Sequence, residues 1–340
     1  MTSLRYLGLA SLLLLAGCRE SAQASTTPQQ QQQPPGYYYP PQQQPYPSQQ
    51  PPGQQPPPGV QPQVPAQQRP LLAPLIGQAA QEQEVRMILS ELINALPAQS
   101  RPLVANIPLN VDPTPEVNAF AGCDDKGNPY MAATAGILEA VDAISQTKAT
   151  DELFGTQTYE AYCAQVLPQL VQSQQARAGL PAGIIPQQYG GDPRRWSRAR
   201  EIFQDVIAFT FGHELAHHYL GHTGCAKGQA LGGAPDLSRA GRLLSNIVPV
   251  FNQFQESASD SSGVYNVLDA GRARRPQYEW SEYGGVTLLD YFARLERAAG
   301  GGGPLSVLSP IALLKSHPNP LLRIPIVQQY ARTWRSTHPG

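Results

Sequence analysis

The sequence has no excess of charge of either sign and no hydrophobic run of transmembrane length. Its 340 residues include 24 basic and 25 acidic side chains, which gives a formal net charge of −1. Proteins that bind nucleic acid usually present a basic surface, so the composition predicts no nucleic-acid partner. A helix needs about 20 apolar residues to cross a bilayer, and the apolar run at residues 7–16 is too short for that.

Cysteine is also scarce, with four residues in the whole chain. The first, Cys18, follows a segment with the features of a secretory signal peptide, in which Arg5 precedes the apolar run. Residues 15–18, Leu-Ala-Gly-Cys, resemble the lipobox of bacterial lipoproteins. We expect residues 1–17 to be removed and Cys18 to be acylated, because more than one acyl chain gives stable membrane anchoring. The alternative is an ordinary secretory signal with an incidental cysteine.

The residues after Cys18 predict a cellular location and a tether. Arg19 follows the cysteine, and the absence of aspartate there resembles lipoproteins of the outer membrane, so we expect the periplasmic face of the cell envelope. Residues 18–70 are rich in Gln, Pro, Gly and Tyr, and such a segment buries too little apolar surface to fold. We interpret it as a tether, extended at about 3.1 Å per residue. A Pro/Gln/Tyr-rich ligand for an envelope assembly partner is the alternative.

Four of the six histidines lie within residues 213–222. His213, Glu214 and His217 form the motif H-E-x-x-H. Because residues i and i+4 lie one above the other on a helix, both imidazoles can reach one Zn²⁺ through bonds of about 2.0–2.1 Å. Glu214 is rotated by about 100° from His213, which puts it beside the metal. There it can act as general base and then as general acid toward a water that the zinc activates.

The residues around this motif favour a buried metal centre over a helix with surface histidines. Apolar residues recur upstream at helical spacing: Ile202, Val206, Phe209, Ile207 and Phe211. Gly221 and Gly224 provide a helix stop. Polar side chains on a buried helix need partners, and a metal ion supplies one.

The third zinc ligand must come from outside the motif. The metzincin pattern H-E-x-x-H-x-x-G-x-x-H is excluded, because Gly221 and His222 are out of step with it. Glu256 and Asp260 form an i, i+4 pair on a second predicted helix. We expect Glu256 to bind the zinc and Asp260 to accept the second N–H of a ligand histidine. A solvated acidic helix face is the ordinary alternative for such a pair.

H-E-x-x-H followed by E-x-x-x-D resembles the HtpX-like zinc metallopeptidases, a gluzincin family that includes CAAX prenyl endopeptidases and periplasmic lipoproteins. Residues 117–138, with V-N-A-F-A and G-I-L, and residues 316–324, S-H-P-N-P-L-L-R-I, resemble two further family motifs. The resemblance implies a mainly helical α+β fold of the minigluzincin type, with a small sheet beside the zinc helix. It also implies one zinc ion per chain and peptide hydrolysis by residues 71–336, with residues 337–340 as a tail.

The resemblance also guides expectations for substrate binding. It implies that a sheet edge lies along the active-site cleft, and an extended peptide can pair with such an edge. We expect this edge to consist of Met131, Ala132, Ala133 and Thr134. Residues 146–192 are an insertion relative to the family, and we interpret residues 150–191 as a lid or wall over the cleft.

His317 and Arg323 belong to the last of these motifs. His317 is expected near the zinc, where it would donate to the oxyanion of the transition state or occupy the open metal position. The alternative is that it only shapes the start of a helix. Arg323 is expected to orient the acidic group behind the metal, for example Asp260.

Three cysteines remain after acylation of Cys18, so an exported protein can form one disulfide and keep one thiol. Cys225 closely follows the zinc helix and Cys123 interrupts the predicted sheet, so we expect the pair Cys123–Cys225. Cys163 as a partner of either remains open. A cysteine ligand to zinc is not needed, since two histidines and a glutamate are present.

Periodicity and turn signals predict the remaining elements. Strands are expected at 104–111, 118–121 and 129–134, with Pro108 at an edge. Helices are expected at 78–96, from 136, from 193, and at 236–270, 285–299 and 320–334. The sequence thus predicts an exported, lipid-anchored zinc endopeptidase. The family resemblance and the membrane address imply that its substrates are misfolded or misassembled envelope proteins. The alternative is a chaperone or assembly factor with the same fold, either non-catalytic or latent. The presence of Glu214 and every ligand favours the enzyme.

Overall fold

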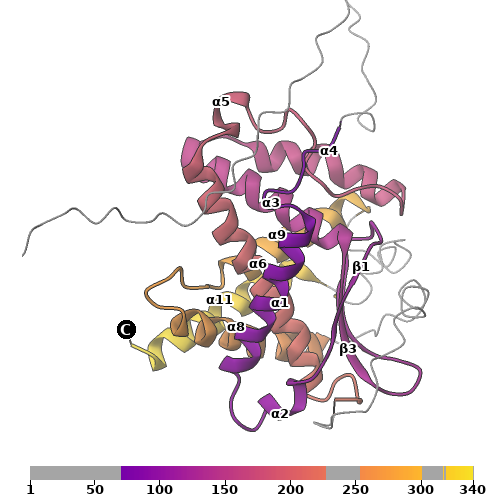
Figure 1. The fold of residues 1–340 in the computed structure, drawn as a ribbon, viewed down its shortest axis with the longest axis vertical. Coiled ribbons are helices and arrows are strands. Elements are labelled where there is room, and N and C mark those ends of the chain that lie inside the picture. Colours follow the sequence, from indigo (N-terminus) through magenta and orange to yellow (C-terminus); the bar gives the residue numbers. More distant parts are fainter. Residues whose placement is uncertain (1–69, 227–252, 301–316, 318, 340) are drawn as a thin grey trace, which may run out of the picture. The chain divides into compact units, whose positions relative to one another are not determined.

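The computed structural model describes residues 70–226, 253–300, 317 and 319–339. All of them belong to one compact unit, Pro62–Gly340. The signal peptide, Cys18 and nearly all of the tether expected at residues 18–70 lie outside the described residues, as does the first part of the helix expected from residue 236. In the described part the fold is mainly helical with one small sheet (Figure 1), which confirms the predicted fold class.

The central element is helix α6, Pro193–Tyr219, which carries H-E-x-x-H in its last two turns. It begins where predicted: the Asp192 side chain accepts a hydrogen bond from the Arg194 backbone N–H at 2.8 Å, and Pro193 occupies the first helical position. Every residue from Ile202 to His218 is buried, because helices contact α6 on several sides. The motif therefore lies within the hydrophobic core, as its flanking residues indicated.

Five of the other described helices pack directly against α6, which lies among them (Figure 1). The predicted helices at 78–96, 285–299 and 320–334 are present with ends shifted by a few residues. The last part of the helix predicted at 236–270 is also present and continues to Ala273. The described helices are α1 Gln78–Ala95, α2 Arg101–Val104, α3 Ala135–Phe154, α4 Thr158–Gln172, α5 Gln187–Gly190, α8 Gln253–Ala273, α9 Tyr283–Ala298 and α11 Pro320–Thr337.

Three strands form the sheet: β1 Leu109–Asp112, β2 Ala119–Cys123 and β3 Pro129–Thr134. Their order is β1-β3-β2, with β1 parallel and β2 antiparallel to β3. The prediction that Met131, Ala132, Ala133 and Thr134 form a free edge is therefore wrong. These residues belong to the central strand, whose hydrogen-bonding groups are used by both neighbours, and all four side chains are buried. The strand next to the H-E-x-x-H helix is β2.

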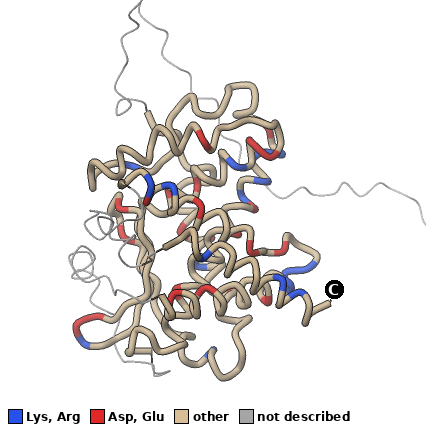
Figure 2. The backbone as a smooth tube through the Cα atoms, turned by 180° about the vertical axis from the view of Figure 1, so that it is seen from behind, with Lys and Arg blue, Asp and Glu red and all other residues tan. Residues whose placement is uncertain are grey.

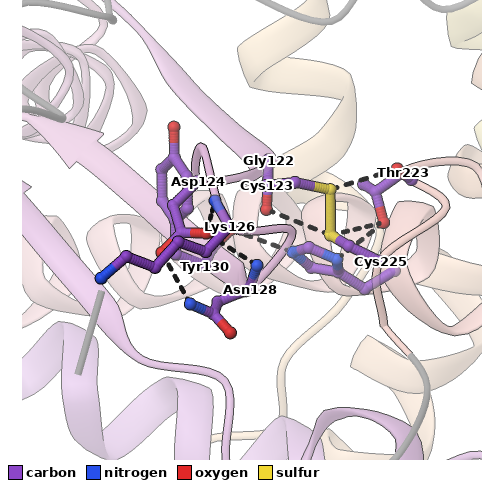
Figure 3. The surroundings of a disulfide bond; sticks show 9 residues. Gly122, Cys123, Asp124, Lys126, Asn128, Tyr130, Thr223 and Cys225 are labelled. Atoms are coloured by element: carbon purple, nitrogen blue, oxygen red, sulfur yellow. Dashed lines mark hydrogen bonds between the residues drawn. A yellow bond between two sulfur atoms is a disulfide. The ribbon is translucent and has the colours of Figure 1, made fainter. Parts of the chain in front are cut away.

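The sheet is joined to the end of α6 at two points. Cys123, at the end of β2, forms a disulfide with Cys225, six residues after α6 ends (Figure 3). His218, buried at the end of α6, lies with Nε2 3.0 Å from the carbonyl oxygen of Tyr130 in β3. Cys163 is a buried free cysteine in α4. These links hold the β2–β3 hairpin against the helix that carries the motif.

The insertion at residues 146–192 is part of the core. Helix α4 packs against α3 and α9, and the side chains of Tyr159 and Tyr162 are buried in the same hydrophobic cluster as α6. None of residues 150–191, all of which are described, lines the cavity beside the motif. The insertion therefore belongs to the packed scaffold, and the structure does not show the expected lid.

No helix within the described residues is both long enough and apolar enough to cross a bilayer. Along the described backbone the basic and acidic residues are interspersed (Figure 2).

Candidate metal centre

Four side chains from three segments converge beside α6. Ligand atoms of His213, His217, Glu256 and His317 all lie within 4.8 Å of one another, and all four residues are buried. The two histidines of the motif come from α6, and Glu256 comes from the first turn of α8. His317 comes from the segment just before α11. The structure thus brings together the candidate ligands expected from sequence and places His317, which was also expected near the zinc, in the same group.

Helix α8 reaches the motif because it contains a glycine where it meets α6. A Cβ atom at Gly263 would lie 2.9 Å from the backbone nitrogen of His213, closer than real Cβ atoms approach. The close approach lets the side chains of Asp260 and Glu256, one and two turns earlier on α8, reach the two imidazoles.

The distances fit a tetrahedral zinc site. Zinc bonds of about 2.0–2.1 Å imply ligand atoms about 3.3–3.4 Å apart. The Nε2 atoms of His213 and His217 are 3.0 Å apart. The Glu256 carboxylate oxygens lie 3.5 Å from the first and 3.3 Å from the second. Within the described part of the chain, buried Glu256 Oε1 accepts no hydrogen bond, so a cation between these atoms would supply the partner that it lacks.

The charges also fit a divalent cation. Glu214, Glu256, Asp260 and Arg323 are all buried here. With the carboxyl groups ionised, three negative charges face one positive charge. Buried charge without compensation is costly, and a Zn²⁺ ion would neutralise the surplus of two negative charges. The residues present therefore fit zinc in geometry, donor type and charge.

Asp260 lies beside a motif histidine, at the position expected for an acceptor behind the metal. Its Oδ1 lies 3.0 Å from Nδ1 of His213, the ring nitrogen that does not face the ligand group. An acceptor at this position holds the proton on Nδ1 and leaves the Nε2 lone pair for a metal. Arg323 pairs with Asp260 through two contacts of 2.7 Å, as predicted, and its third nitrogen also lies 2.7 Å from Glu256.

Glu214 lies beside the ligand group and is held by the sheet. Its Oε2 accepts a hydrogen bond from the backbone N–H of Ala121 in β2 at 2.8 Å. Its Oε1 lies 3.5 Å from Nε2 of His317. Burial raises the pKa of Glu214 above its ordinary value, which suits a group that must take up a proton during a reaction.

The protonation of the other groups follows from burial and from charge. Burial lowers the pKa of both motif histidines. At His213 the charge of Glu256 and the contact with Asp260 outweigh burial and raise the pKa to about 10, whereas the pKa of His217 falls to about 2. Burial raises the pKa of Glu256, but His317 and His213 hold it well below its usual range. Since zinc binds neutral imidazole, it must displace the proton on Nε2 of His213, while Nδ1 keeps its proton toward Asp260.

His317 lies between Glu214 and Glu256. Its Nδ1 is 3.0 Å from Glu256 Oε2, and its Nε2 faces Glu214. The interpretation that His317 only shapes the start of a helix does not account for a buried imidazole in contact with both carboxylates. A cavity adjoins this group on the side of α9; it is lined by Ala119, Ile137, Phe209, Thr210, His213, Glu214, Leu288, Leu289, Phe292, His317 and Arg323.

Two groups at this site were not predicted from the sequence. The Ala121 N–H is a backbone donor, and no side-chain pattern marks it. His222 was assigned no part in the site from sequence, but it lies with Nδ1 3.0 Å from Nδ1 of His217. A usable signal for His222 was the glycine before it, since a helix stop at that position turns the next residue back toward the helix.

The comparison with known protein families agrees with this geometry. The model described as Peptidase family M48 matches residues 79–339, which include the sheet, α6, α8 and α11. No curated protein and no solved structure matches the chain at a significant level. The family is one of zinc-dependent metallopeptidases, and the match covers more than half of the chain. The resemblance to HtpX-like zinc metallopeptidases is thereby confirmed, and the chain belongs to peptidase family M48.

Proposed function

We propose that the protein is an exported, lipid-anchored zinc endopeptidase that hydrolyses peptide bonds of misfolded or misassembled proteins of the cell envelope. The observation that carries the peptidase activity is the site itself. Nitrogen and oxygen atoms of His213, His217 and Glu256 surround one position, and Glu214 lies beside it in the orientation set by Ala121.

Each residue has a distinct part in this reaction. His213, His217 and Glu256 would hold the zinc ion, which when bound supplies a Lewis acid that polarises the scissile carbonyl and acidifies water. Glu214 takes a proton from the attacking water and gives it to the leaving amine. Arg323 balances the charge of the acidic groups on α8.

The proposed cellular location is based on the N-terminal sequence. The apolar run at residues 7–16 and Leu-Ala-Gly-Cys at residues 15–18 support export and acylation at Cys18. Residues 18–70 would then carry the peptidase away from the membrane surface, so that it meets polypeptides on the periplasmic side. The disulfide between Cys123 and Cys225 is consistent with an oxidising compartment.

The peptidase proposal is tested with Glu214→Gln. We expect casein cleavage by the purified protein to fall by about 10²–10⁴-fold, at a zinc content equal to that of the wild type. Glu201→Gln is the matched control, because Glu201 lies on the same helix in an ion pair with Arg198 and outside the metal site. Equal cleavage by Glu214→Gln and the wild type would refute the assigned role.

The address is tested with Cys18→Ser. Membrane fractionation should find the wild type with the outer membrane and the variant in the soluble periplasmic fraction. Recovery of both proteins in the soluble fraction would leave an exported enzyme without a lipid anchor.

A latent enzyme is the second candidate, and the position of His317 favours it. Its imidazole lies within the ligand group and contacts Glu214, so it occupies space that water and substrate need. If the enzyme is latent, His317→Ala raises casein cleavage, and the gain disappears in the double variant with Glu214→Gln. A fall in cleavage would instead assign His317 to stabilisation of the oxyanion. A wild type that binds zinc and, like both variants, cleaves nothing would favour the chaperone function.

A further inference from the structure

Helix α6 ends in a glycine cap that begins within the metal motif. Gly221 has φ 78°, in the left-handed region that glycine adopts without strain. Its N–H donates to the carbonyl of His218 at 2.9 Å, and the N–H of His222 donates to the carbonyl of His217 at 2.9 Å. These two bonds define a Schellman motif. In such a motif the residue after the glycine commonly contacts the residue five positions earlier, so His222 is turned back onto His217.

The two imidazoles meet through their Nδ1 atoms, which are 3.0 Å apart. The ring centroids are 5.1 Å apart and the planes are inclined by 66°. The other nitrogen of His217, Nε2, faces His213 and Glu256. His217 thus presents Nε2 to the ligand group and Nδ1 to His222.

We propose that His222 is a positioning residue of the metal centre, which accepts the Nδ1–H of His217 and thereby fixes the tautomer and orientation of that ligand. This inference rests on the proposed zinc site. If Nδ1 of His217 carries the proton, its Nε2 lone pair is free for the metal. Nδ1 of His222 must then be unprotonated, with the proton of that ring on Nε2. Metal-binding histidines usually have such a partner on their second nitrogen.

A second contact ties His222 to the helix that carries the third ligand. Ser259 Oγ of α8 lies 3.3 Å from the same Nδ1 atom of His222. Ser259 is buried and lies between Glu256 and Asp260 in the sequence of α8. His222 therefore contacts both helices of the metal site, which limits the rotation of its ring.

A neutral acceptor suits this position. The partner of His213 is a carboxylate, Asp260, whose charge is matched by Arg323. The buried carboxylates and Arg323 together with Zn²⁺ already sum to no net charge. A second carboxylate behind His217 would add a buried negative charge without compensation, whereas an imidazole supplies the acceptor without charge.

The test compares His222→Asn with His222→Leu. Asparagine has an oxygen acceptor close to the position of Nδ1, whereas leucine fills similar space without one. In the full-length protein, the zinc dissociation constant from competition with a chelator should rise by about 10–100-fold for the leucine variant. It should stay within a few-fold of the wild type for the asparagine variant. With Co²⁺ in place of zinc, the visible absorption bands should change in the leucine variant and stay the same in the asparagine variant.

A pair of glycine variants tests the cap separately from the imidazole. Gly221→Ala and Gly224→Ala both add a methyl group with no atom within 4 Å, at φ values of 78° and 76°. Their backbone strain should therefore be similar. We expect only Gly221→Ala to weaken zinc binding beyond its effect on stability, because only that variant displaces His222.

These experiments distinguish a wrong role for His222 from a wrong assignment of the metal centre. If the leucine variant binds zinc as tightly as the wild type with an unchanged cobalt spectrum, His222 has no positioning role. Equal losses in the asparagine and leucine variants would show that ring shape matters and the acceptor does not, which also overturns it. A wild type that binds no zinc would refute the metal centre itself, together with everything inferred from it.

Discussion

Arg323 joins the two acids that α8 directs at the metal site. One guanidinium nitrogen lies 2.7 Å from Glu256, and the other two lie 2.7 Å from the two oxygens of Asp260. All three residues are buried. The last helix of the chain therefore completes a site whose ligands lie on α6 and α8.

We expect Arg323→Met to lower the free energy of unfolding by about 3–5 kcal/mol, because it removes the buried guanidinium that pairs with two buried carboxylates. Arg323→Lys should lose less, since a point charge cannot contact both acids in the same geometry. Urea unfolding monitored by circular dichroism measures both. Arg332→Met is the matched control on the same helix, at an exposed position where changes stay within about 0.5 kcal/mol. Equal losses for Arg323→Met and Arg332→Met would contradict the prediction.

The disulfide should contribute a large part of the stability, since it closes a loop between residues 102 positions apart. In the chain-entropy model a loop of that length corresponds to about 4–5 kcal/mol. We expect the double variant Cys123→Ser/Cys225→Ser to unfold at lower urea concentration, and reductant to shift the wild type by a similar amount. Cys163→Ala, which removes the buried free thiol, should keep the sensitivity to reductant. A wild type insensitive to reductant in its unfolding midpoint would refute this contribution.

The buried Asp142 should make stability depend on pH. Burial raises its pKa to about 6, against the opposing hydrogen bonds from Leu75 and Gln146. As pH rises from about 4 toward 6, the unfolded chain loses this proton first, so the free energy of unfolding falls, by about 3 kcal/mol in total, and levels off above pH 6. Asp142→Asn should remove that part of the slope in urea unfolding measured from pH 4 to 8. Identical pH profiles of variant and wild type would exclude Asp142 as its source.

The contact between α9 and α6 should not tolerate an added methyl group. A Cβ atom at Gly284 would lie 2.0 Å from the backbone oxygen of Asp205. We expect Gly284→Ala to cost about 1–3 kcal/mol or more, and also to reduce peptidase activity, because α9 lines the cavity beside Glu214. Gly190→Ala, with no atom within 4 Å of its Cβ, should leave both unchanged. Thermal unfolding of the two variants measures the effect on stability, and casein cleavage measures the effect on peptidase activity.

Much of the metal site could be predicted from sequence because its spacing is local. A helix turns every 3.6 residues, so H-E-x-x-H already implies two imidazoles on one face with Glu214 beside them. The pair Glu256 and Asp260 follows from the same geometry. The apolar period before the motif likewise predicted that α6 is buried.

The pairing of the strands could not be predicted from the sequence. The alternation of residues marks β3 as a strand, but nothing in residues 129–134 states how many neighbours it has. That number depends on β1, which pairs with it in parallel from a segment about 20 residues earlier. The prediction of a free edge was wrong for this reason. The prediction that residues 150–191 form a lid was not confirmed for a similar reason, because the burial of α4 depends on its contacts with α3 and α9.

The chemical identity of the candidate ligands, their spacing on two helices and the family of the chain follow from the sequence alone, since these depend on residue type and helical period. Tertiary structure decided which groups surround those ligands. Arg323 contacts Glu256 as well as the expected Asp260, and Ala121 holds Glu214 through a backbone N–H. These contacts join residues more than 60 positions apart, and close packing of helices and sheet determines them where sequence spacing does not.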